Sequence, residues 1–547
     1  MNQTTEPDTQ TLWGNLLKEP LLQYRRVGSG DRIACTLPEL FVAMAHDQVR
    51  DFPALRPHQR HPWHAFLVQL AAIALHRVER TEPFATADEW RAALLALTPN
   101  DPDGAAWCLV SPVDRPAFMQ APEPSGDIST WKNRLVAADE LDMLVTSKNH
   151  DLKAARMQRS SPEEWVYALV SLQTQEGFLG AGNYGISRMN GGFASRCGVG
   201  VHPGGRWGAR WMRDMAALSH HRPALVSSDL GFMDASGHVL IWTIPWDGSA
   251  SLLLNSLDPW YIEICRRVKL RQEDGLKAQV TGSKSPRISA KELNGNTGDS
   301  WMPVDSAAAK ALTITSRGFD YKLSSELLLG SKYRKPSAQE WLTTDDVEGV
   351  HLIAQGVARG QGKTEGYHER RIPISRTIRK AFQSQKTDAL AKLAEERIAA
   401  IAEIRKMLWA ALVALFNSGA KDEKGKDKDA SDIVKERASL FAQPFEAECD
   451  AQFFIELTEE IEAEDRDAVR KRWLCDLADR AERVLRLAFD AGPRSGQLRY
   501  RAQSAALERL RWQMRSDKSK LPALAQALKT RYPTPSRSTR EENHEHA

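Results

Sequence analysis

The stretch LAKLAEERIAAIAEIRKMLWAALVAL, residues 390–415, carries the clearest structural signal in the chain. Its leucines and isoleucines, with one arginine among them, recur at spacings of three and four: Leu390, Leu393, Arg397, Ile401, Ile404, Leu408, Leu412 and Leu415. This spacing places the side chains along one face of a long amphipathic α-helix. Because such a face must be buried against other elements, the stretch predicts a helical domain.

Further helical segments follow this stretch along the chain: 431–464, 465–490 and 497–515. A charged, glycine-containing loop at 420–432 separates the first two helices, and Gly492-Pro493 is a helix stop signal. Four helices joined in this way are typical of a four-helix bundle. We therefore expect a bundle over 386–532 and a disordered tail over 533–547.

Residues 1–385 have a different composition, with Pro, Gly, aromatic residues and short apolar runs mixed together. This mixture is typical of an irregular α+β domain with long functional loops. Within it we predict two helices and two strands: helices over 63–77 and 88–97, strands over 238–244 and 260–264. The predicted fold class is thus α+β, a large irregular mixed N-terminal domain followed by a C-terminal four-helix bundle.

Composition limits the classes of function. The 547 residues are 42% hydrophobic and 27% charged, which indicates a globular protein of more than one domain. Lys and Arg number 74 against 71 Asp and Glu, so any basic surface must be local. The longest apolar stretches, 66–75 and 408–416, are shorter than the roughly 20 residues of a membrane helix. The polar N-terminus lacks a signal pattern, so we expect a cytoplasmic protein without membrane segments.

The cysteines and histidines give no convincing metal site. Six cysteines are scattered without CxxC spacing, which favours free thiols in a reducing compartment. His58, His61 and His64 lie three residues apart, but Pro57 and Pro62 are expected to prevent a regular helix through all three. Packing roles for these histidines are favoured over metal binding. No paired acid/base, nucleophile or zinc-protease pattern is present, so the sequence shows no catalytic centre and no cofactor site.

Residues 177–213 form an unusual run. The run has eleven of the chain's 34 glycines, no acidic residue, and five arginines and five aromatic residues: Arg188, Arg196, Arg206, Arg210 and Arg213, with Phe178, Tyr184, Phe193, Trp207 and Trp211. Glycine permits close approach of a backbone to a ligand, arginine binds phosphate, and aromatic rings stack on bases. The absence of acids favours a nucleic-acid groove. The alternative is a set of tight turns with solvated arginines.

A second basic region lies at 351–380. From Gly356 to Lys380 it contains seven Lys or Arg and two Glu, and Gln361 stands between two glycines at an expected hairpin tip. An exposed amide there can donate and accept hydrogen bonds at base edges, or wedge between bases. A plain loop on a basic surface is the alternative. Gly362-Lys363-Thr364 imitates the end of a phosphate-binding loop, but Val357 occupies the position of its first glycine and Gly366 disfavours the required helix.

Six stretches, in order, resemble the CasA family, the large subunit of the type I-E CRISPR Cascade complex. They are LRPHQ at 55–59, PAFMQ at 116–120, TSKNH at 146–150, the glycine-rich run from 177, NGNTGD at 294–299 and ARGQGKTEGYHERR at 358–371. The resemblance spans most of the first domain, and the predicted bundle stands where the family has one.

The resemblance implies a subunit that is not an enzyme. Guide-RNA pairing would read the target, while this chain recognises the protospacer-adjacent motif on double-stranded DNA from the minor groove, where the code is degenerate. It would promote duplex opening for R-loop formation and provide a platform for a helicase-nuclease. The implied partners are target DNA, the guide-RNA-bound backbone, small and guide-end subunits of Cascade, and that helicase-nuclease.

The family's DNA-contacting residues carry over to positions in this sequence. The glutamine wedge corresponds to Gln361, flanked by Gly360 and Gly362. The glycine loop corresponds to 180–185, with Gly180, Gly182 and Gly185, and reads GAGNYG where the family has more consecutive glycines.

The remaining carried-over residues are basic or polar. The lysine finger corresponds to Lys291, with Lys284 as the rival. The loop that engages the flanking motif corresponds to 146–155, headed by Lys148, Asn149 and His150. A basic groove would hold DNA phosphates through five cations: Arg188, Arg359, Lys363, Arg370 and Arg371. Some family members have a zinc cluster after the segment resembling 260–265, but Cys265 stands alone, so no zinc is expected.

Two other classes of function stay open. One is an NTPase or nuclease, supported only by the imperfect phosphate-loop sequence. The other is a structural scaffold of a ribonucleoprotein, whose bundle binds protein partners while the basic loops contribute little.

Overall fold

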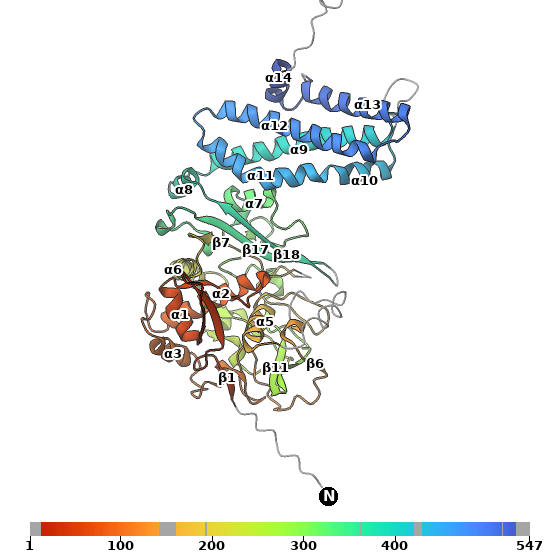
Figure 1. The fold of residues 1–547 in the computed structure, drawn as a ribbon. Helices are drawn as coiled ribbons and strands as arrows, with labels where there is room; N and C mark the ends of the chain where they lie inside the picture. Colours follow the sequence, from red (N-terminus) through yellow and green to blue (C-terminus); the bar gives the residue numbers. More distant parts are fainter. Residues whose placement is uncertain are drawn as a thin grey trace, which may run out of the picture. The chain divides into compact units, whose positions relative to one another are not determined.

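The computed structural model describes residues 12–141, 160–191, 194–360, 363–420, 429–516 and 518–531. Figure 1 shows helices and strands mixed in the first part of the chain and helices in the last part. The chain forms two compact units, one of Met1–Phe319 and Glu326–Arg376 and the other of Asp320–Ser325 and Thr377–Ala547. The predicted α+β class with a helical C-terminal region is confirmed. Among the described residues, no helix combines the length and apolar character that crossing a bilayer requires.

The helices of the first unit are α1 (Leu37–Ala45), α2 (Arg60–His76), α3 (Ala87–Ala96), α5 (Pro162–Gln175), α6 (Trp207–Val226) and, shared with the second unit, α7 (Tyr321–Leu329) and α8 (Arg376–Gln383). Its strands up to the middle of the unit are β1 (Trp13–Asn15), β2 (Leu22–Arg26), β3 (Arg32–Cys35), β4 (Val49–Asp51), β5 (Cys108–Val110), β6 (Asn133–Leu135), β7 (Gly198–His202), β8 (His238–Leu240) and β9 (Leu252–Leu253). The later strands are β10 (Leu257–Ile262), β11 (Arg267–Glu273), β12 (Gly275–Thr281), β13 (Ile288–Ser289), β14 (Val304–Asp305), β15 (Lys310–Ala311), β16 (Tyr333–Arg334), β17 (His351–Gly360) and β18 (Lys363–Pro373). These strands form small sheets of two or three strands each.

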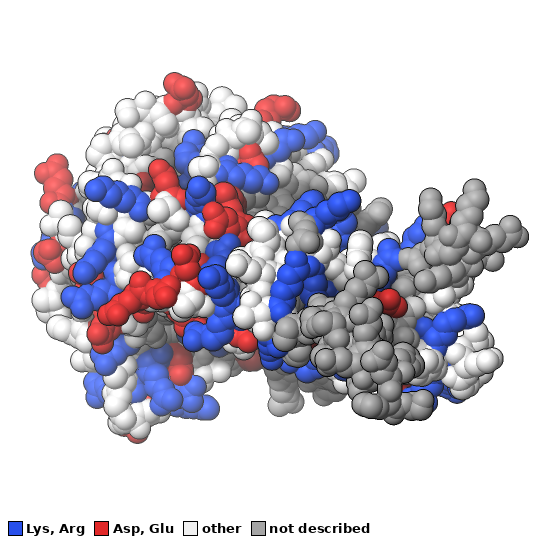
Figure 2. Space-filling model, turned by 90° about the horizontal axis from the view of Figure 1, so that it is seen from above, with Lys and Arg blue, Asp and Glu red and all other residues white. Residues whose placement is uncertain are grey.

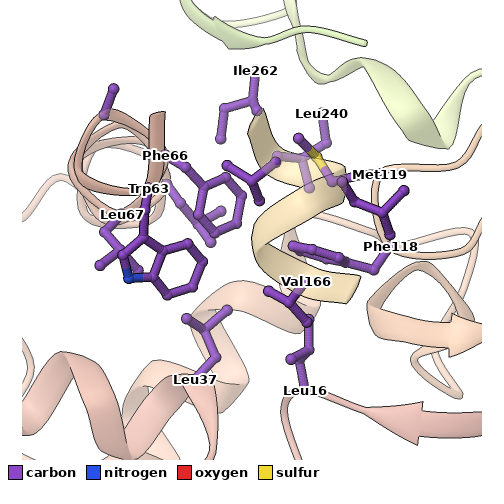
Figure 3. Packing of buried hydrophobic residues seen from close by; sticks show 14 of the residues in the cluster. Leu16, Leu37, Trp63, Phe66, Leu67, Phe118, Met119, Val166, Leu240 and Ile262 are labelled. Carbon is purple, nitrogen blue, oxygen red and sulfur yellow. The ribbon is translucent and has the colours of Figure 1, made fainter. Parts of the chain in front are cut away.

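Helix α2 is the centre of the first unit. It is buried from His61 to Leu75, because α3, α5, α6 and β10 contact it and contribute to the same apolar core. Figure 3 shows Trp63 and Phe66 on α2 facing Val166 of α5 and Phe118. A helix that is apolar on all sides is stable only when neighbours cover every face, which accounts for this position.

Two of the predicted elements differ from the structure. The helix predicted over 63–77 begins earlier, at Arg60, and includes Pro62, so His61 and His64 share α2. His58 lies in the preceding 3-10 turn, Pro57–Gln59, so no regular α-helix runs through all three histidines, as expected. Proline is tolerated in the first turn of a helix, where its missing N–H has no intrahelical partner to lose. The strand predicted over 238–244 ends at Leu240 and continues as a 3-10 turn.

The PAFMQ stretch at 116–120 serves the core. Phe118 and Met119 are fully buried beside α2 and α5 (Figure 3). The Gln120 side chain donates to the carbonyl of Leu109 at 2.9 Å and accepts from the backbone N–H of Leu270 at 2.7 Å. Because this buried amide satisfies backbone groups of two distant segments, the stretch ties β5 to β11.

Strands β18, β17 and β7 form a three-stranded antiparallel sheet in this order. Strand β17 is central and pairs with β18 from His351 to Gly360, and its first eight residues are buried. Strand β7 pairs only with the first half of β17, from His351 to Gln355. The far half of the β17–β18 hairpin therefore extends beyond β7 as a two-stranded ribbon.

The second unit contains α9 (Asp388–Phe416), α10 (Asp432–Phe441), α11 (Gln443–Glu462), α12 (Arg466–Leu487), α13 (Gly496–Arg515) and α14 (Pro522–Arg531). Helix α9 contacts α10, α11, α12 and α13, as expected for the helix with the longest apolar face. The segment predicted as one helix over 431–464 is two helices that meet at Ala442, because Pro444 starts a new helix in its first turn. Helix α14 was not predicted, and residues 533–547 lie outside the described part of the chain.

An arginine occupies the apolar face of α9. The Arg397 side chain is 1% exposed, its Nε lies 2.6 Å from an oxygen of Glu460 on α11, and its guanidinium stacks on the Trp473 ring at 4.0 Å. Arg470 contacts the other oxygen of Glu460 at 3.0 Å. The buried carboxylate thus lies between two guanidinium groups and links α9, α11 and α12.

Replacement of Glu460 by alanine will destabilise the second unit by about 3–5 kcal/mol, because it leaves the buried Arg397 guanidinium without its partner. Chemical denaturation of the full chain, followed by circular dichroism, measures this change. Glu459→Ala is the matched control: its side chain is 59% exposed and its ion pair with Arg472 spans 3.9 Å. The control will change the free energy of unfolding by less than about 1 kcal/mol. Equal losses in both variants would contradict the role given to this pair.

Candidate nucleic-acid interface

The β17–β18 hairpin presents the predicted glutamine. Gly360 pairs with Lys363, so Gln361 and Gly362 connect the two strands, although both residues lie outside the described part of the chain. The register shifts next to Arg359, which pairs with Thr364, whereas Ala358 pairs with Gly366. The extra residue in β18 makes a bulge close to the tip, and bulges bend and twist the ribbon that carries them.

This ribbon lies beside the glycine-rich run. The Arg359 guanidinium forms an ion pair with Glu176, the residue before Gly177, and donates to the Thr364 hydroxyl at 3.1 Å. The Ser195 hydroxyl donates to the Val357 carbonyl at 2.6 Å. Arg359 and Val357 of β17 are therefore bound to Glu176 and Ser195, which lie on either side of the run's central turns. The structure brings together the two regions that the sequence singled out.

The predicted glycine loop, 180–185, is a tight turn. Gly180 and Gly182 have φ angles of +115° and +83°, and the N–H of Asn183 donates to the Gly180 carbonyl at 3.0 Å. Residues other than glycine rarely adopt such φ angles. Gly185 is required for another reason: a Cβ atom there would lie 2.7 Å from the Gly177 carbonyl carbon.

The two candidate lysines occupy different places. The N–H of Ser283 donates to the Gly182 carbonyl at 2.9 Å, and the Tyr184 hydroxyl donates to the Lys284 carbonyl at 3.1 Å. Because of these two hydrogen bonds Lys284 adjoins the glycine loop directly, and its side chain is exposed. Lys291 is also exposed and begins a short 3-10 helix, Lys291–Leu293, before the NGNTGD stretch.

Most arginines of the glycine-rich run are internal. Arg196 binds both oxygens of Asp299, at 2.5 and 2.8 Å, and is 1% exposed. Burial by itself would raise the pKa of Asp299, but Arg196, together with Arg188 and the backbone N–H of Trp301, outweighs burial and keeps this pKa below its ordinary value. Arg188 is buried on the Tyr261 ring and lies 3.8 Å from Glu263. The acids that neutralise this run lie elsewhere in the sequence, so its lack of acidic residues did not indicate free cations.

The five cations of the predicted basic groove do not line one groove. Arg188 and Arg359 are buried in the ion pairs described above. Arg370 and Arg371 are neighbours on β18 and therefore point to opposite faces of the sheet. The Lys363 side chain and the loop head Lys148, Asn149 and His150 lie outside the described residues. Figure 2 likewise shows basic and acidic side chains interspersed on the face in view.

One face of the sheet carries a polar network that the sequence did not indicate. The Gln355 amide donates to the Tyr367 hydroxyl and to Glu369, both at 3.0 Å, and Arg371 donates to Glu369 at 3.0 Å. Arg60 of α2 lies 3.6 Å from the same carboxylate. Alternation along β18 could have placed Tyr367, Glu369 and Arg371 on one face, but only the strand register identifies their partners.

The structure bears on two alternatives raised by the sequence, a phosphate-binding loop and a metal site. Strand β18 begins at Lys363, where a phosphate-binding loop requires a helix, so the GQGKT stretch does not have that architecture. His64 is buried and contacts Asp214 at 2.8 Å, and Asp214 also accepts from the Trp301 indole at 3.0 Å. In the described ranges, no three His, Cys, Asp or Glu side chains are grouped so that they could hold a metal ion.

Comparisons place the fold among CRISPR-associated proteins. No protein-family model and no curated protein sequence matches the chain. Three solved structures align over nearly all of it. Cse1 from Acidimicrobium ferrooxidans has a TM-score of 0.62 at 16% identity and covers 95% of this chain and 99% of its own. Cse1 from Thermobifida fusca has a TM-score of 0.60 at 14% identity and covers 91% of this chain and 96% of its own.

The third, CasA (Cse1) from Thermus thermophilus, has a TM-score of 0.59 at 14% identity, covering 91% of this chain and 98% of its own. The chain therefore has the fold of the Cse1, or CasA, proteins, which confirms the resemblance found in its sequence.

His202 on β7 gives the first unit a pH dependence. Burial, with Arg210 and the stacked His351 ring at 4.6 Å adding to it, lowers the pKa of His202 to about 2. In the unfolded chain this imidazole gains a proton near its ordinary pKa of 6.5, whereas in the fold it stays neutral. The unfolded state therefore binds more protons as the pH falls below 6.5, and stability is lost in that direction.

We expect the free energy of unfolding to fall between pH 7 and pH 5, with His202 contributing up to about 1.4 kcal/mol per pH unit below 6.5. Denaturation at several pH values measures this slope. The variant His202→Gln will have a shallower slope, while the control His238→Gln, at an exposed position on β8, will keep that of the parent chain. An unchanged slope in His202→Gln would refute the assignment.

Proposed function

We propose that this chain is the large subunit of a type I-E CRISPR Cascade complex and that it recognises a motif flanking the target on double-stranded DNA. The observation that carries the proposal is the fold-wide likeness to Cse1 structures, which extends over both compact units. A chain of a CRISPR RNA-guided surveillance complex is also similar, with a TM-score of 0.56, 12% identity, and coverage of 91% of this chain and 100% of its own. On this proposal the chain is not an enzyme.

The hairpin supplies the duplex-opening element. Gln361 would stand on a two-residue connection, since Gly360 and Lys363 are already paired. The ribbon behind it is held by the ion pair of Arg359 with Glu176 and by the Ser195 hydrogen bond. A rigid support matters because a wedge that opens base pairs must withstand an unstacking cost of about a few kcal/mol per step. The amide can also donate and accept hydrogen bonds at the degenerate minor-groove edge.

The glycine loop and the lysines would lie along the DNA backbone. Gly180 and Gly182 allow a phosphate to approach the main chain closely, and Lys284 adjoins this loop. The contacts of Lys284 with the loop make it a stronger candidate for the lysine finger than Lys291. Phosphate contacts of this kind position the duplex without carrying sequence information. The residues 146–155 would complete the interface.

The helical unit would contact the other protein subunits. It exposes large apolar side chains, with Ile433 78%, Tyr500 77% and Trp512 68% accessible. Exposed apolar side chains of this size are available for contacts with protein partners. On this proposal the unit contacts the guide-RNA-bound subunits and offers a platform for a helicase-nuclease after R-loop formation.

The proposal is tested by binding guide-loaded Cascade, with and without this chain, to duplexes that differ only in the trinucleotide flanking the target. We expect the chain to confer a preference for particular flanks, because only protein contacts distinguish duplexes with identical guide pairing. Electrophoretic mobility shift at fixed salt measures the preference. Identical affinities with and without the chain would contradict flank recognition and favour a scaffold function.

The Gln361→Ala variant tests the wedge within the complex. It will impair binding to closed duplexes by about tenfold or more, since one step of unstacking is worth about a few kcal/mol. Binding to DNA that is already unpaired beside the flanking motif will change much less. Gln272→Ala, the same change at an exposed position in β11, is the control. Equal losses of Gln361→Ala on both substrates would exclude the wedge.

A further inference from the structure

A cavity of about 310 Å³ lies on the polar face of the β18–β17–β7 sheet. Its floor is formed by that face, including Gln355 and Arg371. Its walls come from four other segments of the first unit: β2, β4 with the residues after it, the start of α2, and the start of α6. The cavity is therefore built entirely within one compact unit.

The lining is strongly basic. Five arginines and one carboxylate line the cavity: Arg25, Arg50, Arg60, Arg210, Arg371 and Asp51. Arg25 binds both oxygens of Asp51, at 2.6 and 2.9 Å. Arg50 lies 3.8 Å from the same carboxylate and is 60% exposed. The one Asp51 carboxylate thus faces the guanidinium groups of both Arg25 and Arg50. Their positive charge is only partly neutralised, so a further anion can bind here.

Arg210 is the most deeply buried of the five lining arginines and has unpaired nitrogen atoms. It is 5% exposed, and its Nη1 donates to Gln355 at 3.4 Å. Its Nε and Nη2 have no hydrogen-bond partner among the described residues, and Asp214 is no nearer than 3.7 Å to Nε. The Nδ1 atom of His202, which is 7% exposed and also lines the cavity, is unpaired within the same ranges. Buried donors without acceptors are costly, and an anion in the cavity would satisfy them.

The side chains are held in place before any ligand arrives. Glu369 fixes Arg371 at 3.0 Å and lies 3.6 Å from Arg60, and Gln355 bridges this carboxylate to Arg210. Trp207, at the start of α6, also lines the cavity. The carboxylate of Asp47 already accepts from the Ala209 N–H in the first turn of this helix, at 3.2 Å, so the guanidinium groups rather than the helix N-terminus are available to a ligand. Prealigned guanidinium groups of this kind are suited to a tetrahedral oxyanion.

We propose that this cavity is a phosphate-binding site centred on Arg210 and Arg50, separate from the hairpin tip. The phosphate belongs either to a nucleic-acid backbone or to a free nucleotide or inorganic phosphate. Arg210 supplies its two unpaired N–H groups, His202 supplies a third donor, and Arg50 closes the site from the solvent side. The inference does not rest on the proposed function, because it depends only on the contacts within the first unit.

Isothermal titration of the purified full chain with inorganic phosphate tests the site. We expect saturable binding to one site, weakened about tenfold or more in Arg210→Gln, because hydrogen bonds to charged groups are lost. Arg50→Gln changes an exposed side chain and so leaves the fold intact, and it will weaken binding about threefold. Arg80→Gln, an exposed arginine that stacks on Phe84 outside the cavity, is the matched control and will bind like the parent chain.

Absence of phosphate binding by the parent chain, or equal affinity in Arg50→Gln, Arg210→Gln and Arg80→Gln, would overturn the site. Competition identifies the source of the phosphate. If a single-stranded oligodeoxynucleotide displaces phosphate, the site holds a nucleic-acid backbone; if only adenosine monophosphate displaces it, the site holds a free nucleotide. Loss of flank preference in the complex together with intact phosphate binding would contradict the proposed function and leave this site supported.

Discussion

Buried pairs of arginine and carboxylate are the interaction on which the first unit depends. Its short strands and long irregular segments cannot be held by regular hydrogen bonding alone. Arg196 with Asp299, Arg188 with Glu263, and Arg213 with Asp345 join segments that are 75 to 132 residues apart. The Arg213 guanidinium donates to Asp345, to Asp214 and to the Ala338 carbonyl, so this single side chain orders several segments at once. Removing one partner would leave a buried charge, which is far more costly than losing a surface pair.

These pairs also position the candidate interface. The ion pair between Arg359 and Glu176 fastens the β17–β18 ribbon to the start of the glycine-rich run, and a bulge interrupts the ribbon's register beside this pair. The glycine loop is shaped by positive φ angles and by the lack of space for a Cβ atom at Gly185. Arg188 and Arg359, which were expected to contact DNA phosphates, are instead buried in ion pairs within the unit.

The sequence and the structure agree best where local periodicity decides the outcome. The apolar face of 390–415 predicts α9, and the stop signals around it predict the other long helices of the unit. Even there, Pro444 divides one predicted helix into two, because a proline that ends one helix can begin the next. In the first unit, strand positions were predicted poorly, since a strand of three residues is determined by its partners rather than by its own pattern.

The sequence by itself determined the fold class, the helical unit and the resemblance to the CasA family. These properties depend on neighbouring residues or on a linear order of motifs. Only the tertiary structure decided which arginines are free. The acids that neutralise Arg188 and Arg196 lie 75 and 103 residues away, and the arginines of the cavity come from separate strands and helices. Opposite charges neutralise one another when they lie within a few ångströms in space, whatever their separation along the chain. The composition of one segment could therefore not show which of its arginines are paired.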